Sequence, residues 1–284
     1  MIKPLFKYLS LICIAPLCAI PKSELQNLLK QSHPFCYDLG IKVMPGKQTN
    51  SGVTICCHGY GDHSRVGEVV HSFKVIPDHL VSFNFPDYDC IRRKLTVDQT
   101  VFGTPDEIMP ILFLLKRLVI DGGVDHVSLY GFSAGGGAIV NVLATLNQTM
   151  RDEQLKKIGI DAEGKKKIIA ALQKGIVILD CPLKSMDEIG DFRPGSQMDV
   201  LSKRYRDNNM RPIDSIKLLK GLNLAILVHF QNPDEMISNK DDAEFIERLK
   251  NANAGSTHSV IASEGGHNTY HRSLWNEYKK IRKS

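Results

Sequence analysis

Ser133 is the residue whose surroundings point most directly to chemistry. Gly131 and Gly135 flank it in the sequence G-F-S-A-G, which matches the pattern G-x-S-x-G. A strand-like run at 126–130 precedes it, and a helix-like run from about 135 to 146 follows. A sharp turn between strand and helix exposes the serine Oγ, and its crowded flanks require glycine. We therefore predict a nucleophile, rather than a glycine-rich helix start that only allows close packing.

A serine nucleophile needs a base, and the base needs an acid that orients it. His267 follows a glycine pair on the loop after the last strand-like run, and His271 is its nearest rival. Asp234 lies in the sequence Asn-Pro-Asp-Glu after the preceding strand-like run. Because these are ordinary turn formers, a plain surface turn is the alternative reading of Asp234. Glu235 and Asp180 are its rivals as the acid.

Acyl transfer also needs N–H donors for the negatively charged oxygen of the intermediate. The backbone N–H of Ala134, directly after the nucleophile, is one candidate. The second is expected from the loop after the first central strand, which begins His58-Gly59-Tyr60. Glycine permits the unusual backbone path that an inward-pointing amide requires. We therefore assign the second donor to the Tyr60 N–H.

Apolar runs must build the elements that position these residues. Strands are expected at 34–43, 52–57, 80–85, 126–130, 175–179, 222–230 and 259–262. Helices are expected at 66–75, 104–118, 135–146 and 241–249, the second beginning with Thr104 as N-cap, Pro105 in the first turn and Glu107 completing a capping box. This alternation predicts an α/β fold whose mainly parallel sheet has helices on both faces. Sites in such sheets lie beyond the carboxyl ends of the strands, where the candidate residues fall.

With these residues identified, the chain resembles the α/β-hydrolase superfamily from about residue 36 to its end. The residues that carry the resemblance are His58, Gly59, Gly131, Gly135, Asp234 and His267. Their order of serine, then acid, then histidine is typical of this fold. The resemblance implies a serine hydrolase that cleaves carboxylic esters, of small molecules or lipids, through an acyl-enzyme and without a cofactor or metal. Peptidase or acyltransferase activity on the same residues, and a non-catalytic binding protein of this fold, are the alternatives.

The segment 58–64, HGYGDHS, is similar to the oxyanion loop of the monoacylglycerol lipase and lysophospholipase group, also called serine aminopeptidase S33-like hydrolases. Two positions depart from that group. Phe132 stands where a histidine usually precedes the nucleophile, and 84–87 reads Asn-Phe-Pro-Asp instead of an Asp-His-Arg-Gly type of loop. A monoglyceride substrate therefore does not follow from the resemblance.

The segment 183–221 lies between two expected strands, where this fold usually carries a cap. It mixes apolar residues with charged ones, among them four arginines: Arg193, Arg204, Arg206 and Arg211. One interpretation is a solvated helical insertion. The other is an entrance that favours acidic esters, because arginine suits carboxylate and phosphate groups.

The first 19 residues have the pattern of a targeting segment. Lys3 and Lys7 precede an apolar run at 9–20, in which Ala19 is a small residue suited to a cleavage point. The run is shorter than the roughly 20 residues of a membrane span. We expect an exported protein, secreted or periplasmic, with an uncleaved membrane anchor as the alternative.

Composition excludes several other classes. The 284 residues are 43% hydrophobic and 24% charged, which is typical of a globular chain and not of a disordered or coiled-coil one. The net charge of +5 comes without a long basic run inside the chain, so no nucleic-acid partner is expected. The odd number of cysteines does not suggest a disulfide framework. Cys56, Cys57 and Cys181 are expected to be small buried residues of strand-like runs.

Overall fold

A computed structural model describes residues 21–30, 39–47, 52–60, 63–88, 94–96, 99–148, 152–189, 195–252, 255–262, 266–267 and 272–283. The leader, and with it the expectation of export, lies outside these residues, as do His271 and Arg193. Within the described ranges, no helix is both long and apolar enough to cross a membrane.

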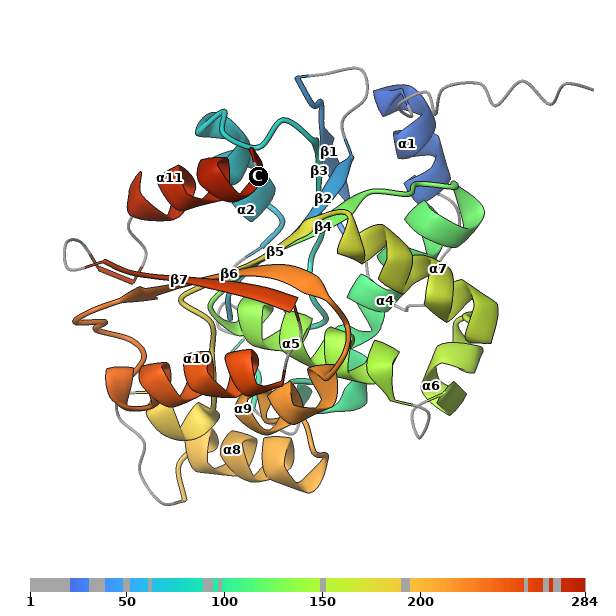
Figure 1. Ribbon diagram of the computed structural model, residues 1–284. Coiled ribbons are helices and arrows are strands. Elements are labelled where there is room, and N and C mark those ends of the chain that lie inside the picture. The colour runs from blue at the N-terminus through green and yellow to red at the C-terminus, as the bar shows by residue number, and fades with distance from the viewer. Residues whose placement is uncertain are drawn as a thin grey trace, which may run out of the picture.

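The described strands form one seven-stranded sheet in the order β1-β3-β2-β4-β5-β6-β7 (Figure 1). The strands are β1 Lys42–Met44, β2 Val53–Cys57, β3 His79–Ser82, β4 Val127–Phe132, β5 Ile176–Asp180, β6 Leu224–Gln231 and β7 Gly255–Ala262. Among these seven described strands, only β1 pairs antiparallel, at one edge, and the other strand pairings are parallel. This confirms the predicted mainly parallel sheet.

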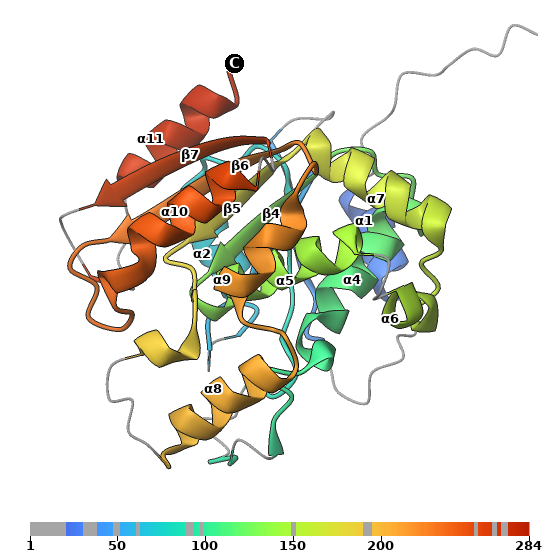
Figure 2. The same ribbon diagram turned by 60° about the horizontal axis from the view of Figure 1, so that its bottom comes forward.

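Helices cover both faces of the sheet, as expected. They are α1 Lys22–Lys30, α2 Val66–Ser72, α4 Met109–Leu115, α5 Ala134–Asn147, α6 Asp152–Lys157, α7 Ala162–Gln173, α8 Gln197–Asp207, α9 Pro212–Ser215, α10 Asp242–Asn251 and α11 Arg272–Ile281. Helices α2 and α11 lie on one face, and α4, α5, α7 and α10 lie on the other (Figure 1). Between β5 and β6, α8 stands away from the sheet at the edge of the molecule (Figure 2).

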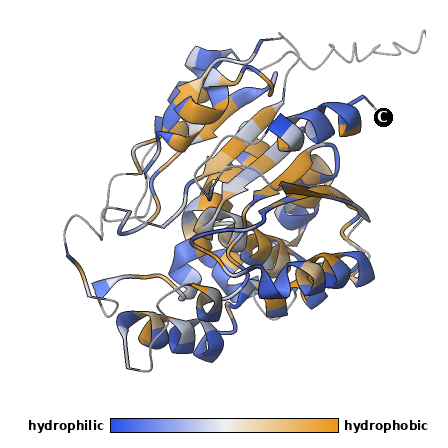
Figure 3. Ribbon diagram, turned by 90° about the vertical axis from the view of Figure 1, so that its left-hand side faces the viewer, coloured by the Kyte–Doolittle hydropathy of each residue, from blue (hydrophilic) through white to orange (hydrophobic). Residues whose placement is uncertain are grey.

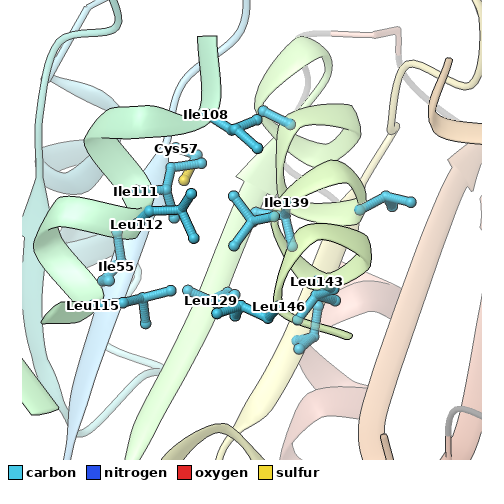
Figure 4. Close-up of a cluster of buried hydrophobic side chains, with 14 of the residues drawn as sticks. Ile55, Cys57, Ile108, Ile111, Leu112, Leu115, Leu129, Ile139, Leu143 and Leu146 are labelled. Atoms are coloured by element: carbon cyan, nitrogen blue, oxygen red, sulfur yellow. The ribbon is translucent and has the colours of Figure 1, made fainter. Parts of the chain in front are cut away.

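The core has two layers because side chains alternate across each strand. Ile55 and Cys57 of β2 face the larger cluster, which α4 and α5 complete (Figure 4). Cys56, between them, faces a smaller cluster that contains Trp275 of α11. Cys56, Cys57 and Cys181 are buried free thiols, as predicted. Colouring by hydropathy shows the same layering, with the strands mostly hydrophobic and the outer helix surfaces hydrophilic (Figure 3).

The predicted capping box at Thr104 is wrong. The chain forms a 3₁₀ helix at Pro105–Ile108 before α4, and the Thr104 side chain makes no cap hydrogen bond. Glu107 Oε2 instead accepts from the Gly103 N–H at 2.8 Å, and Oε1 accepts from the Tyr205 hydroxyl at 2.9 Å. The carboxylate is therefore used to attach α8 to the core, a contact between distant parts of the chain that overrides the local pattern.

Candidate active site

Ser133 occupies the turn between β4 and α5 in a backbone conformation that non-glycine residues rarely adopt, with φ 52° and ψ −120°. A Cβ on Gly135 would lie 2.5 Å from the Cys57 carbonyl oxygen, and one on Gly131 would lie 2.7 Å from the Gly135 oxygen. Both positions therefore require glycine, for the steric reason that the motif suggested. Strain of this kind persists only where the surrounding structure imposes it.

Hydrogen bonds with the end of β5, with the loop after it and with the first turn of α5 impose this strain on Ser133. The Ser133 N–H donates to the Asp180 carbonyl at 2.9 Å, and the Ser133 carbonyl accepts from the N–H groups of Gly136 and Leu183, each at 2.9 Å. Helix α5 begins at Ala134. The first N–H groups of a helix have no partner within the helix, and its N-terminus favours negative charge. The Ala134 amide therefore lies in the first turn of α5, directly beside Ser133.

His267 and Asp234 form the hydrogen bond that the sequence predicted. His267 Nδ1 donates to Asp234 Oδ2 at 2.7 Å, and the two side chains are 5% and 4% exposed. Asp234 Oδ1 also accepts from the N–H groups of Met236 and Ile237. Burial alone would raise the pKa of the Asp234 carboxyl, but these hydrogen bonds from His267 and the two amides outweigh it and lower that pKa. The carboxylate thus stays ionised, and it fixes the tautomer in which His267 Nε2 accepts protons.

The rival acids have other partners. Both Glu235 carboxylate oxygens accept from the backbone N–H of His267, at 2.8 and 2.9 Å, and do not bond its ring. Asp180 Oδ1 accepts from His229 Nδ1 at 2.7 Å, and Asp180 Oδ2 accepts from the Tyr130 hydroxyl at 2.7 Å. Of the three carboxylates, only Asp234 bonds the His267 ring.

A cavity of about 450 Å³ opens beside these residues, and both Ser133 and His267 line it. Among the described residues no hydrogen bond joins their side chains directly. Such bonds are often long in the free enzyme and shorten when substrate binds. The Phe132 ring, in the position where the resembling group has a histidine, packs 5.0 Å from the His267 ring. The Phe132 ring thus packs against the His267 ring.

The loop after β2 is attached to the loop after β3 through buried His58. The Phe85 N–H donates to His58 Nε2 at 3.0 Å, so Nδ1 carries the proton and donates to the Gly59 carbonyl at 2.7 Å. Gly59, Tyr60 and Ala134 all line the cavity near Ser133. The Tyr60 ring packs against Phe102 at 4.7 Å. The residues predicted to supply the oxyanion donors therefore line the same cavity as Ser133.

The remaining cavity wall is apolar, and the sequence did not predict it. It consists of Leu183, Met186, Ile189, Met198, Leu201, Tyr205, Met236 and Ile237. Met198, Leu201 and Tyr205 are spaced by three and four residues along α8, which places them on one face of that helix. That spacing was the available signal, and the charged residues between them obscured it.

The structure does not support an arginine-lined entrance. Arg204 donates to the Thr100 carbonyl at 2.8 Å, Arg206 pairs with Asp187 at 3.0 Å, and Arg211 pairs with Asp214 at 3.0 Å. None of the described lining residues of the cavity is an arginine. Arg206 and Arg211 thus bond acids within the insertion, and Arg204 joins the insertion to the segment at residue 100.

Comparison with known proteins identifies the fold. No family model matches this sequence, and no curated protein matches it. The structure is similar to a lipase/esterase from Lactobacillus plantarum, at 12% identity and a TM-score of 0.62, over 89% of this chain and 95% of that one. The chain has the α/β-hydrolase fold. Esterase B from Lactobacillus rhamnosis is also similar, at 14% identity and a TM-score of 0.56, over 92% of this chain and 89% of that one.

An acylaminoacyl peptidase from Pyrococcus horikoshii matches over 88% of this chain and 39% of its own, at 12% identity and a TM-score of 0.56. The α/β-hydrolase fold thus recurs here on a sequence with very low identity to all three structures. The narrower resemblance to the monoacylglycerol lipase and lysophospholipase group is not confirmed.

Proposed function

We propose that this α/β-hydrolase chain is a serine hydrolase that cleaves carboxylic esters. The observation that carries the proposal is that strained Ser133 opens onto the same cavity as His267, whose ring is hydrogen-bonded to buried Asp234. A nucleophile, a base and an orienting acid at the carboxyl ends of parallel strands are the parts that acyl transfer requires. The similarity to a lipase/esterase and to an esterase supports the same reaction class.

In the proposed reaction, Ser133 Oγ attacks the ester carbonyl while His267 Nε2 takes the Oγ proton. Asp234 stabilises the resulting imidazolium, and the backbone N–H groups of Tyr60 and Ala134 donate to the oxyanion. The C–O bond to the alcohol then breaks, and the alcohol leaves with the proton from His267. Water, activated by the same base, hydrolyses the acyl-enzyme and restores Ser133. No step needs a cofactor or a metal.

The apolar cavity wall supports an ester whose acyl or alcohol part is itself apolar, a small molecule or a lipid. Methionine is unbranched and adaptable, so Met186, Met198 and Met236 suit ligands of more than one shape. The leader supports export of this enzyme, with membrane attachment through the same segment as the alternative.

A fluorophosphonate probe, which reacts covalently with an activated serine, tests the assignment. We expect labelling of the native chain and none of Ser133→Ala, while Ser72→Ala, at an exposed helix position, is labelled like the native chain. Undiminished labelling of Ser133→Ala would refute the proposal. A panel of p-nitrophenyl esters of increasing acyl length, with matching anilides, then measures ester preference and separates an esterase from a peptidase.

A further inference from the structure

Lys184 is a fully buried charged residue just after β5, at the base of the insertion that carries α8. Its side chain is 0% exposed, and its Nζ donates to the Ser238 carbonyl at 2.8 Å and to the Asp242 carboxylate. The Phe230 ring lies below it, with its centroid 5.1 Å from Nζ. A buried ion pair is often replaceable by apolar residues without loss of stability. Its presence beside a candidate active site therefore raises the question of what the pair positions.

The pair leads through one side chain to the candidate acid. Asn239 Nδ2 donates to Asp242 Oδ2 at 2.8 Å and to the Gln231 carbonyl at 2.6 Å. Asn239 Oδ1 accepts from the Asp234 N–H at 3.2 Å. Because both ends of the Asn239 amide have partners, its orientation is fixed. Lys184, Asp242 and Asn239 thus form a continuous chain of polar contacts that ends on the backbone of Asp234.

The same place joins the insertion and the nucleophile turn. Ile189 and Ile237 form an antiparallel β-bridge, which connects the insertion to the loop that carries the acid. Leu183, directly before Lys184, donates its N–H to the Ser133 carbonyl at 2.9 Å. Leu183, Ile189 and Ile237 all line the cavity. Lys184 therefore lies where the nucleophile turn, the insertion and the acid loop meet.

We propose that Lys184 is a positioning residue, which holds the loop of Asp234 in the place where its carboxylate orients His267. The inference rests on the proposed function, because it assigns a partner to the candidate acid. Lys184 touches neither substrate nor the reacting atoms and acts through Asp242 and Asn239. A small displacement of a catalytic group lowers the rate of the chemical step strongly, so the loss should appear in kcat rather than in KM.

Two variants break the chain at different points. Lys184→Met combined with Asp242→Asn removes both charges and leaves no unpaired buried carboxylate. Asn239→Ala, at a partly exposed position, leaves both members of the Lys184–Asp242 ion pair in place and removes the three Asn239 hydrogen bonds, among them the link to Asp234. It therefore keeps the test open if the double variant does not fold. Arg282→Met is the matched control, because it removes the ion pair of Arg282 with buried Asp78, neither of which lines the cavity.

We expect kcat for a p-nitrophenyl ester to fall by about tenfold to a hundredfold in both test variants, with KM changed by no more than about twofold. Arg282→Met should keep kcat while its thermal unfolding temperature falls. Unchanged kcat in the variants that fold would overturn the inference, as would a loss no larger than that of Arg282→Met at equal stability. Fluorophosphonate labelling of Ser133 in the native chain separates the two hypotheses: its absence refutes the proposed function, whereas labelling with unaffected variants refutes only the role of Lys184.

Discussion

Two aspartate–histidine pairs with hydrogen bonds of equal length lie toward the carboxyl ends of the parallel strands of this protein. In Asp234–His267 and in Asp180–His229, a histidine Nδ1 donates to a carboxylate oxygen at 2.7 Å. The first pair sits on the loops after β6 and β7, and its histidine lines the cavity with Ser133. The second lies across β5 and β6, and His229 is 0% exposed.

The comparison shows that a short hydrogen bond between an aspartate and a histidine does not by itself indicate a base. The Asp180 carboxylate also accepts from the Tyr130 hydroxyl, so it ties β4, β5 and β6 together inside the sheet. The Asp234 carboxylate is instead held by amides of its own loop, beside the cavity that Ser133 and His267 line. The two histidines differ in their surroundings, because His267 lines the cavity with Ser133, whereas His229 is buried inside the sheet. We therefore expect a chemical role for His267 and a structural role for His229.

Removing each histidine should separate the pairs most strongly. We expect His267→Ala to lower kcat for an ester by a factor on the order of 10⁵–10⁶, because the nucleophile loses its base. His229→Gln should keep kcat within about tenfold and lower the free energy of unfolding by about 1–3 kcal/mol, because a buried partner of Asp180 is lost. Steady-state kinetics and denaturant unfolding measure both. Equal losses of kcat would show that the distinction between the pairs is mistaken.

Removing each negative charge is the next test. Asp234→Asn keeps the shape of the acid but lets the histidine adopt the wrong tautomer, so kcat should fall by about 10⁴. Asp180→Asn should mainly destabilise the fold, because the buried Tyr130 hydroxyl and His229 ring would lose the charged group that accepts their hydrogen bonds. Circular dichroism first shows which variants are folded. The kcat of each folded variant, relative to that of the native chain, then shows which aspartate supports catalysis. A larger loss in Asp180→Asn would make it the acid instead.

Buried Glu107 differs from Asp234 in the direction of its pKa shift, and its titration should have a smaller effect, on stability. It is 2% exposed and bonds only the Gly103 N–H and the Tyr205 hydroxyl, with no imidazole beside it among the described residues. Burial raises its pKa from 4.5 to about 7, with those two hydrogen bonds opposing the rise, whereas the pKa of Asp234 is lowered. The native state therefore holds a proton that the unfolded chain has lost between these pH values, so stability should fall as pH rises from about 4.5 to about 7.

Glu107→Gln keeps a neutral side chain of the same shape and should remove this dependence. We expect the variant to gain on the order of 1–3 kcal/mol in unfolding free energy relative to the native chain between pH 5 and pH 8. Urea unfolding of both proteins at the two pH values measures the difference. Parallel stability curves for the two proteins would rule out Glu107 as the titrating group.

The sheet and the strained turn at Ser133 were predictable because their signals are local. An apolar run such as 175–179 can only be buried on both faces, and β5 is buried throughout. The turn at Ser133 demands glycine at positions two residues away, so the motif carries its own steric explanation. Helix α7 was missed because lysines dominate its first half, and only Ile168, Ala171 and Leu172 mark a buried face near its end together with Gly164.

The sequence by itself thus predicted which residues are candidates for chemistry and the order in which the strand ends present them. Tertiary structure alone decided that Asp234, and not its rivals Glu235 and Asp180, bonds the His267 ring. It also decided that Arg204, Arg206 and Arg211 bond partners that do not line the cavity, and that Glu107 bonds a tyrosine 98 residues later. The physical reason is the distance along the chain over which each kind of interaction acts. Steric and periodic constraints act between neighbours in the chain, whereas ion pairs and hydrogen bonds join whichever side chains packing brings together. Lys184 and Asp242, 58 residues apart, meet only because β5 and β6 lie side by side.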